Sequence, residues 1–328
     1  MVLTKRILVV LLGPHARKLG KDDKRFLIAV GIFPMILLSL LASMLIVIVV
    51  KSIPIFEHEG IAIFVSSVWR AVEGSAEEEF YGLLPAIWGS IYTATIAVIV
   101  GGVLSICFAV FVEDMVPFRF KDLLSTLMDV MAALPTIVYG LWAAACLAPL
   151  LLEYVYKPLH QLLGWTPFFS FPPKTGYTLG TAGILLGIMI TPYAAAMIRE
   201  AYSAIPLSYV EAMYSLGATK LEAIRLRLGM IKPAIIAALV LGFGRAVGET
   251  VAVALVVGNS LTLTLSLTSP GTTVASLIAN MFASAPYYTY MESALFAGGL
   301  ALFIIGLVVN SVGLLVIKKW EERIGLHM

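Results

Sequence analysis

The sequence has little charge and almost no cysteine, and both shortages exclude large classes of protein. Charged residues make up 13% of the chain and hydrophobic residues 60%, whereas an average soluble domain is about a quarter charged. A soluble domain of this size could not bury so much apolar surface, so the composition predicts a membrane protein that crosses the bilayer several times. Cys107 and Cys146 both lie in apolar runs, which excludes a disulfide framework and a CxxC metal site.

Catalytic and nucleotide-binding motifs are also missing. No GxxxxGK[ST] sequence occurs, so we expect no P-loop and no nucleotide hydrolysis on this chain. The histidines His15, His58, His160 and His327 fall in predicted loops or tails, where solvated polar side chains are the simplest interpretation. We therefore predict no catalytic residue, no metal site and no cofactor on this chain.

Six apolar stretches are long enough to cross about 30 Å of hydrocarbon, which takes about 20 helical residues. They are continuous rather than alternating, which excludes the strands of a membrane β-barrel. The sequence therefore predicts an all-α, polytopic bundle of six transmembrane helices. The stretches are Phe26–Val50, Leu83–Val112, Leu123–Leu152, Leu179–Ile198, Pro233–Val257 and Ala294–Ile317.

Lysine and arginine gather on one side of these stretches. The N-terminus, the second loop, the fourth loop and the C-terminus are basic, whereas the other loops hold only Lys51, Arg70, Lys157 and Lys174. By the positive-inside rule we expect both termini in the cytoplasm. The uncharged segment Asn259–Tyr290, rich in serine and threonine, then lies outside, either as a plain loop or as a partly re-entrant, pore-lining segment.

Two opposite charges, Arg245 and Glu249, interrupt the fifth apolar stretch. Arg245 comes twelve residues after Pro233, or about 18 Å along a helix, near the middle of the bilayer. A charge there costs roughly 2.5–3.5 kcal/mol on insertion scales, so it indicates a function. A structural ion pair is one interpretation. The other is an anion site, in which the guanidinium binds an oxyanion through two parallel hydrogen bonds and Glu249, on the same helical face, prevents the anion from being held too tightly.

The glycines around Arg245 suggest close helix packing. The run from Gly242 to Gly248 resembles a dinucleotide-binding fingerprint, but its spacing differs by one residue and no strand precedes it. Gly244 and Gly248 instead form a GxxxG pattern, which lets another helix approach closely. The same pattern recurs at Gly183 and Gly187.

The stretch between the fourth and fifth apolar segments is long for a connection between membrane helices, which is typical of a functional loop. Glu211–Ala218 predicts a short helix ended by Gly217, and Leu221–Leu228 predicts a second one. Two short helices across the cytoplasmic face would form a docking surface for another protein. The alternative is a solvated surface loop.

Several motifs carry a family resemblance. Glu211-Ala-Met…Gly217-Ala resembles the EAA motif of ABC importer permeases, which seats in a groove of the ATPase subunit. Leu84-Pro-Ala-Ile-Trp-Gly89, the run from Leu134 to Trp142, and Gly244-Arg-Ala-Val-Gly-Glu-Thr250 are similar to permeases of phosphate importers of the PstC type. The resemblance extends from about Tyr81 to the C-terminus. One departure is Gly229-Met230 where the EAA motif normally ends in Leu-Pro, and another is Ala-Met in place of Ala-Ala.

The resemblance implies a type I ABC importer permease fold in the plasma membrane of a prokaryote. It implies residues 1–80 as N-terminus, first helix and outer loop, 81–320 as the transmembrane domain with a coupling loop at 199–232, and 321–328 as a cytoplasmic tail. Implied partners are a PstA-type sister permease, two PstB-type ATPases that bind ATP and Mg, and a PstS-type phosphate-binding protein.

For the individual residues, the resemblance implies that Arg245 contacts phosphate and Glu249 modulates it, with Asp129 as a weaker candidate or a carboxylate at a helix start. Glu211, Ala212, Gly217 and Ala218 would couple the chain to the ATPase. Two alternatives stay open at this point. One is a permease for sulfate, molybdate or tungstate, and the other is a channel or carrier that works without ATP.

Overall fold

A computed structural model describes residues 21–324 of the chain. Contacts divide the chain into two compact units, Met1–Val50 and Lys51–Met328. The predicted basic N-terminal residues Lys5, Arg6, Arg17 and Lys18 lie outside the described residues, as does the tail after residue 324. The domain limits at residues 80 and 320 stay predictions.

Five helical stretches of the described residues are long and apolar enough to cross a membrane: Val30–Glu59, Leu84–Met115, Thr136–Leu163, Leu179–Ser203 and Met291–Lys319. A sixth candidate is the pair Lys220–Met230 and Lys232–Gly248, which is bent by 65°. These spans confirm the predicted fold class, an all-α polytopic bundle.

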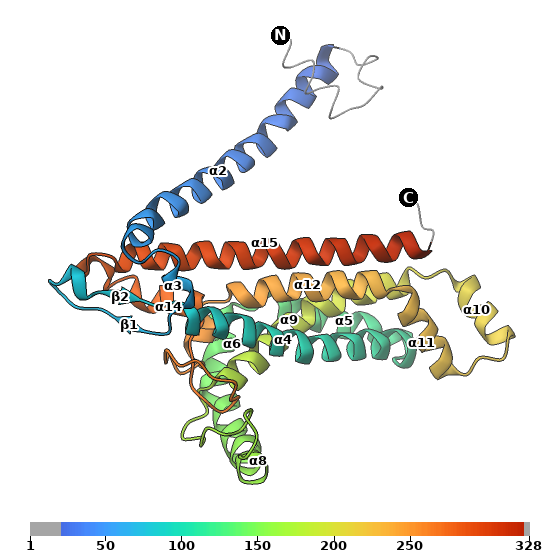
Figure 1. Ribbon diagram of the computed structural model, residues 1–328. Coiled ribbons are helices and arrows are strands. Elements are labelled where there is room, and N and C mark those ends of the chain that lie inside the picture. Colours follow the sequence, from blue (N-terminus) through green and yellow to red (C-terminus); the bar gives the residue numbers. More distant parts are fainter. Residues whose placement is uncertain (1–20, 325–328) are drawn as a thin grey trace. The chain divides into compact units, whose positions relative to one another are not determined.

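The elements follow one another along the chain as Figure 1 shows. The longest helices are α2 (Lys21–Glu59), α4 (Leu84–Val110), α9 (Leu179–Ser203), α12 (Lys232–Gly248) and α15 (Met291–Ile324). Two short strands, β1 (Trp69–Arg70) and β2 (Phe80–Tyr81), pair antiparallel with Trp69 opposite Tyr81. The other elements are α3 (Ala62–Val65), η2 (Ala76–Glu78), α5 (Phe118–Ala133), α6 (Thr136–Trp142), α7 (Ala148–Leu151), α8 (Lys157–Leu163), α10 (Leu207–Ser215), α11 (Lys220–Met230), α13 (Val251–Ala254), α14 (Val274–Met281), η6 (Ala285–Tyr287) and the π-helical turns η3 (Phe111–Met115), η4 (Ala143–Leu147) and η5 (Leu152–Tyr156).

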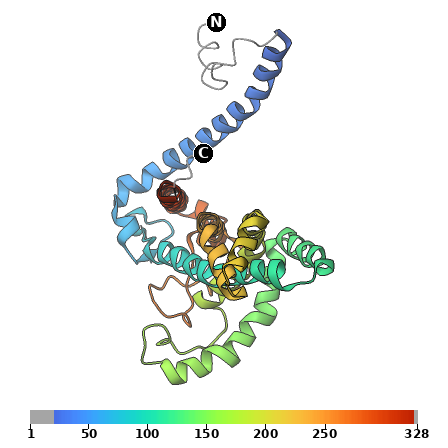
Figure 2. The same cartoon turned by 90° about the vertical axis from the view of Figure 1, so that its right-hand side faces the viewer.

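In the second unit α4, α9, α12 and α15 lie side by side, as the two views in Figures 1 and 2 show. Small residues let α4 and α9 approach closely. A methyl group on Gly183 would lie 2.6 Å from the side chain of Ile96, and one on Gly187 would lie 2.9 Å from that of Val100. Contacts of this kind, rather than burial from water, hold helices together in lipid. The predicted close packing at Gly183 and Gly187 is therefore confirmed.

The predicted span Leu123–Leu152 is wrong, because the chain breaks inside it. α5 ends at Ala133, Leu134 and Pro135 are extended, and α6 begins at Thr136. Proline cannot donate a backbone hydrogen bond, and it disfavours helical geometry in the residue before it. The membrane span therefore starts after this proline and runs over Thr136–Leu163.

Residues 258–273 form an extended segment that folds back against the beginnings of α4 and α9. The first N–H groups of α9 point at this segment, since Leu179 N–H donates to Ser269 O at 3.0 Å and Gly180 N–H to Leu267 O at 2.9 Å. The hydroxyl side chains of the segment are buried, Ser266, Thr268, Ser269 and Thr272 among them. The segment is thus a loop that is partly buried against the helices, and a re-entrant, pore-lining role for this region stays a prediction.

A buried carboxylate ties β2 to the start of α15 at the same end of the bundle. Glu79 is 1% exposed and accepts hydrogen bonds from Thr289 N–H, Tyr290 N–H and Tyr81 O–H, each at 2.9 Å. Burial by itself would raise the pKa of Glu79, but these donated hydrogen bonds outweigh it and hold the pKa below the usual value. The ionised carboxylate is thus part of the folded structure.

We expect Glu79→Gln to destabilise the chain by about 2 kcal/mol, because an amide has one acceptor oxygen and cannot satisfy all three donors. A lowered folded-state pKa stabilises the fold fully above the unfolded pKa, and this stabilisation is lost as pH falls below it. The difference in Tm between wild type and variant should therefore shrink below pH 4.5, the ordinary value. Glu78→Gln, the exposed neighbour, is the control and should leave Tm unchanged at every pH.

Candidate functional site

Arg245 lies in the last turn of α12. This helix has Pro233 in its first turn, where a missing N–H costs nothing, and it ends at Gly248. The cation is favoured there by the partial negative charge of the last carbonyl groups. Ala246 and Val247 are buried at 3% and 5% exposure, whereas the side chain of Arg245 is exposed on the surface of this chain. The helix thus presents a guanidinium within a membrane segment.

Glu249 lies at the end of α12 and not within it, so the predicted continuous helix through Arg245 and Glu249 is wrong. The helix ends one residue earlier, and Glu249 is extended with φ −69° and ψ 127°. Its carboxylate turns to the next short helix, where Oε1 accepts from Ala252 N–H at 3.4 Å. Among the described residues no ion pair joins Arg245 to Glu249. The structural ion pair is therefore not formed, and Arg245 keeps its charge available.

Two broken helices meet beside Arg245. α13, which follows the break after α12, packs against α6, where a methyl group on Gly140 would lie 2.9 Å from the Cα atom of Ala252. Tyr139 of α6 is 8% exposed and donates to Met131 O at 2.8 Å across the α5–α6 break. Non-helical backbone at membrane depth occurs where it is buried in protein or lines a cavity. Discontinuous helices of this kind form substrate sites in many transporters.

The second candidate region is the helix pair α10 and α11, at the opposite end of the bundle from β1 and β2 (Figure 1). α10 ends in a glycine turn: Gly217 has φ +84°, Gly217 N–H donates to Tyr214 O, and Ala218 N–H donates to Met213 O. Only glycine adopts this conformation without strain. Thr219 and Glu222 then cap the start of α11 reciprocally. Two short helices joined at Gly217 were predicted, and both are confirmed.

This helix pair exposes apolar side chains. Leu207, Leu216 and Leu221 are 69%, 88% and 65% exposed. A hollow of about 400 Å³ lies beside the turn, lined by Leu216, Gly217, Ala218, Glu222, Arg225 and Leu226. The side chains of Glu211 and Ala212 are exposed on α10. Exposed apolar groups around a hollow are typical of a surface that another protein covers.

Residues 105–322 match the family of binding-protein-dependent transport system inner membrane components. The match covers the π-helical turn η3, both broken helices, the α10–α11 pair and most of α15. The chain belongs to this family. It is a component of a transport system, and the apolar spans place it in a membrane.

Curated relatives are similar to this chain over most of its length. The probable phosphate transport system permease protein PstC of Methanocaldococcus jannaschii is 52% identical over 274 residues, which cover 84% of this chain and 87% of that protein. The phosphate transport system permease protein PstC of Haemophilus influenzae is 35% identical over 305 residues, covering 90% and 93%.

Solved structures share the fold. A bacterial ABC transporter involved in the import of the acidic polysaccharide alginate has a chain with a TM-score of 0.59 and 15% identity, covering 91% of this chain and 98% of that one. The MetNI methionine ABC transporter has a chain with a TM-score of 0.51 and 16% identity, covering 72% and 95%. At these identities the likeness concerns the ABC importer permease fold alone.

Asp129 has a different setting from the one expected, and the predicted packing at two glycines has no partner helix among the described residues. Asp129 lies in the last turns of α5, not at a helix start, so that interpretation is wrong; its side chain is exposed. A methyl group on Gly244 or Gly248 would meet no atom of the described residues within 4 Å. The close approach at these two glycines therefore stays a prediction that needs a helix from another chain.

Sequence reasoning missed Tyr139 and the break at Pro135. The signal was present, because Leu134-Pro135 stands in the middle of the apolar run. An apolar run with a proline in it nevertheless predicts one helix, since prolines are common in membrane helices.

Proposed function

We propose that this permease is one of two membrane subunits of an ATP-driven importer that carries inorganic phosphate by alternating access. The observation that carries the proposal is Arg245, a guanidinium that has no carboxylate partner among residues 21–324 and lies at a meeting point of two broken membrane helices. A planar guanidinium binds an oxyanion such as phosphate through two charge-assisted hydrogen bonds. The similarity to PstC permeases supports phosphate as that anion.

The remaining parts belong to other subunits. The chain has no P-loop sequence, so ATP and Mg would be bound by two PstB-type ATPases docked on α10 and α11. A PstS-type protein would deliver phosphate at the outer end, and a PstA-type permease would complete the path. Both termini would lie in the cytoplasm, because the termini and the loops on their side of the membrane hold most of the lysines and arginines.

In this mechanism Glu211, Ala212, Gly217 and Ala218 lie on the surface that the ATPases contact. Closure of the ATPases on ATP would move α10 and α11. Since α11 leads into α12 through the 65° bend, the motion would reach Arg245 and change the side from which it is accessible. Glu249, at the helix break, would modulate the affinity for the anion as the two breaks rearrange.

The proposal is tested by uptake of labelled phosphate into proteoliposomes that hold the complete importer, with sulfate and molybdate as competitors. We expect uptake that requires ATP and is unaffected by either competitor. Full competition by sulfate or molybdate would show that the substrate is another oxyanion. Flux through this chain alone, without ATP, would show a channel or carrier and would contradict the proposal.

A further inference from the structure

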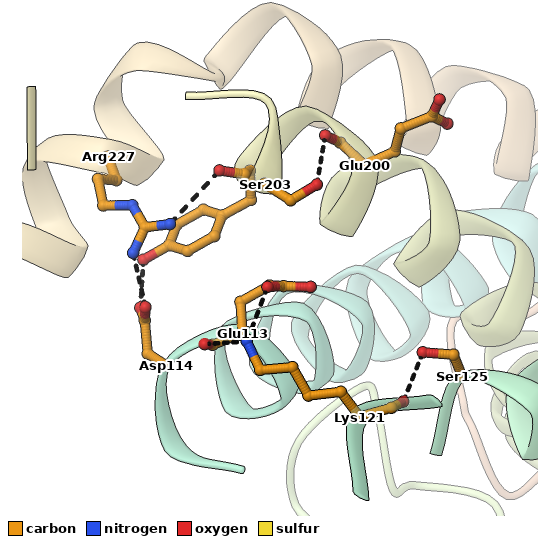
Figure 3. A network of polar contacts seen from close by, with 8 residues as sticks. Glu113, Asp114, Lys121, Ser125, Glu200, Ser203 and Arg227 are labelled. Atoms are coloured by element: carbon orange, nitrogen blue, oxygen red, sulfur yellow. Dashed lines mark hydrogen bonds and ion pairs between the residues drawn. The ribbon is translucent and has the colours of Figure 1, made fainter. Parts of the chain in front are cut away.

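A buried ionic contact joins three elements at the end of the bundle where α10 and α11 lie. Arg227 of α11 donates from Nη1 to Asp114 Oδ1 at 2.6 Å, and Asp114 belongs to η3, which continues α4. Asp114 Oδ2 also accepts from the hydroxyl of Tyr202, near the end of α9. Figure 3 shows Arg227 reaching from one helix towards Asp114 on another. The contact spans 113 residues of sequence.

The guanidinium has a second partner of a different kind. Its central carbon lies 3.8 Å from the centre of the Tyr202 ring, a cation–π contact, and Nη2 donates to Tyr202 O at 3.4 Å. Arg227 is therefore held by the carboxylate of one membrane helix and by the ring of another. Together these contacts fix the orientation of the Arg227 guanidinium as well as its distance from Asp114 and Tyr202.

Burial shows that this contact is not an ordinary surface ion pair. The side chains of Arg227 and Asp114 are 13% and 14% exposed, and Tyr202 is fully buried. Apolar side chains surround them, among them Ala109, Ile198, Leu228 and Ile231. The Nε atom of Arg227 is buried and has no hydrogen-bond partner in the part of the chain that the structure describes. Desolvation cancels much of the attraction in such pairs, so stability alone explains them poorly, whereas removal of one partner is strongly destabilising.

The position of the contact suggests what it does. Apart from it, α11 is connected to the bundle through the chain itself, which bends by 65° into α12, and through apolar contacts. The contact adds a directional link from α11 to α4 and α9, the two helices that pack most closely with each other in the bundle. A displacement of α11 would then move three membrane helices together, not only α12.

We infer that Asp114, Tyr202 and Arg227 form a joint that transmits movement of the α10–α11 surface to α4 and α9 and so couples ATP use to phosphate movement. The inference rests on the proposed function. The three are positioning residues, because none of them lies beside Arg245 or binds phosphate. The joint keeps α11 in one orientation on the membrane helices while the ATPases push or pull on it.

The residue before Asp114 offers a matched control. Glu113 and Lys121 also form an ion pair, with Lys121 Nζ donating to Glu113 O at 2.7 Å and to Glu113 Oε2 at 3.1 Å (Figure 3). This pair links η3 to α5 and does not involve α11. The side chains of Lys121 and Glu113 are 26% and 18% exposed, slightly more than those of Arg227 and Asp114. It has the same chemistry and location, without the link to the α10–α11 surface.

The test measures phosphate moved per ATP hydrolysed by the complete importer in proteoliposomes. The main variant, Asp114→Leu with Arg227→Met, replaces the charges by apolar side chains of similar size, which preserves folding in comparable buried pairs. We expect normal assembly and Tm, continued ATP hydrolysis, and about a tenfold loss of phosphate moved per ATP, within the range typical of coupling between two sites. Tyr202→Phe, which keeps the ring, should lose less. The control, Glu113→Leu with Lys121→Met, should couple normally.

Three outcomes would overturn the inference: normal coupling in the Asp114→Leu, Arg227→Met variant, an equal loss in the control, or failure of the main variant to assemble, which would show a structural role. Failure of the proposed function is distinguishable, because the wild-type importer itself would then show no ATP-dependent phosphate uptake.

Discussion

Arg245→Gln should abolish ATP-driven phosphate uptake by the assembled importer. Glutamine keeps a polar side chain but loses the charge and the planar pair of donors that bind an oxyanion in parallel. Loss of one partner of a desolvated charge pair costs about 3 kcal/mol, or roughly a hundredfold in uptake. The measurement is the initial rate of labelled phosphate uptake, at equal amounts of assembled complex.

The control for this prediction is Arg119→Gln, which removes the same charge from an exposed position on α5. It should transport normally. Assembly is expected to survive Arg245→Gln, since Arg245 makes no ion pair with another described residue and its removal leaves no buried carboxylate unpaired. Uptake by the Gln variant at the wild-type rate would place the anion site elsewhere and would remove the main support for the proposed function.

Local signals predicted much of the fold and of the coupling surface. Gly217 follows a helical run and precedes Thr219 and Glu222, so the turn and both short helices can be derived from neighbouring residues. The same holds for the apolar spans, whose length and continuity are set by the thickness of the bilayer. Features of this kind need no knowledge of what the chain contacts in space.

Features that depend on tertiary contacts could not be predicted. The pair of Asp114 and Arg227 joins residues 113 positions apart, and neither lies in a pattern that singles it out. Glu249 illustrates a different error. A spacing of four residues predicts an interaction between two side chains only while the helix continues, and α12 ends at Gly248.

Gly89 in α4 lies directly against the segment 258–273, with no room for a side chain. A methyl group at this position would lie 1.9 Å from Thr272 O, well inside the contact distance of any real side-chain atom. Gly→Ala in a helix normally stabilises by about 1 kcal/mol, because alanine has the higher helix propensity. Here overpacking should outweigh that gain, and we expect Gly89→Ala to destabilise the chain by about 3 kcal/mol.

Relaxation cannot remove this clash, because both sides are fixed. Thr272 is 2% exposed, Gly271 N–H donates to Val257 O, and Val274 N–H donates to Ser90 Oγ one residue from Gly89. Moving the segment away would break these hydrogen bonds and leave buried polar groups unpaired.

The measurement is Tm of the purified chain, together with the amount that assembles in the membrane. Gly306→Ala in α15 is the control and should raise Tm, since a methyl group there would meet no atom of the described residues within 4 Å. An unchanged Tm for Gly89→Ala would mean that residues 258–273 move aside at little cost in free energy. The segment would then be a mobile part of the outer end.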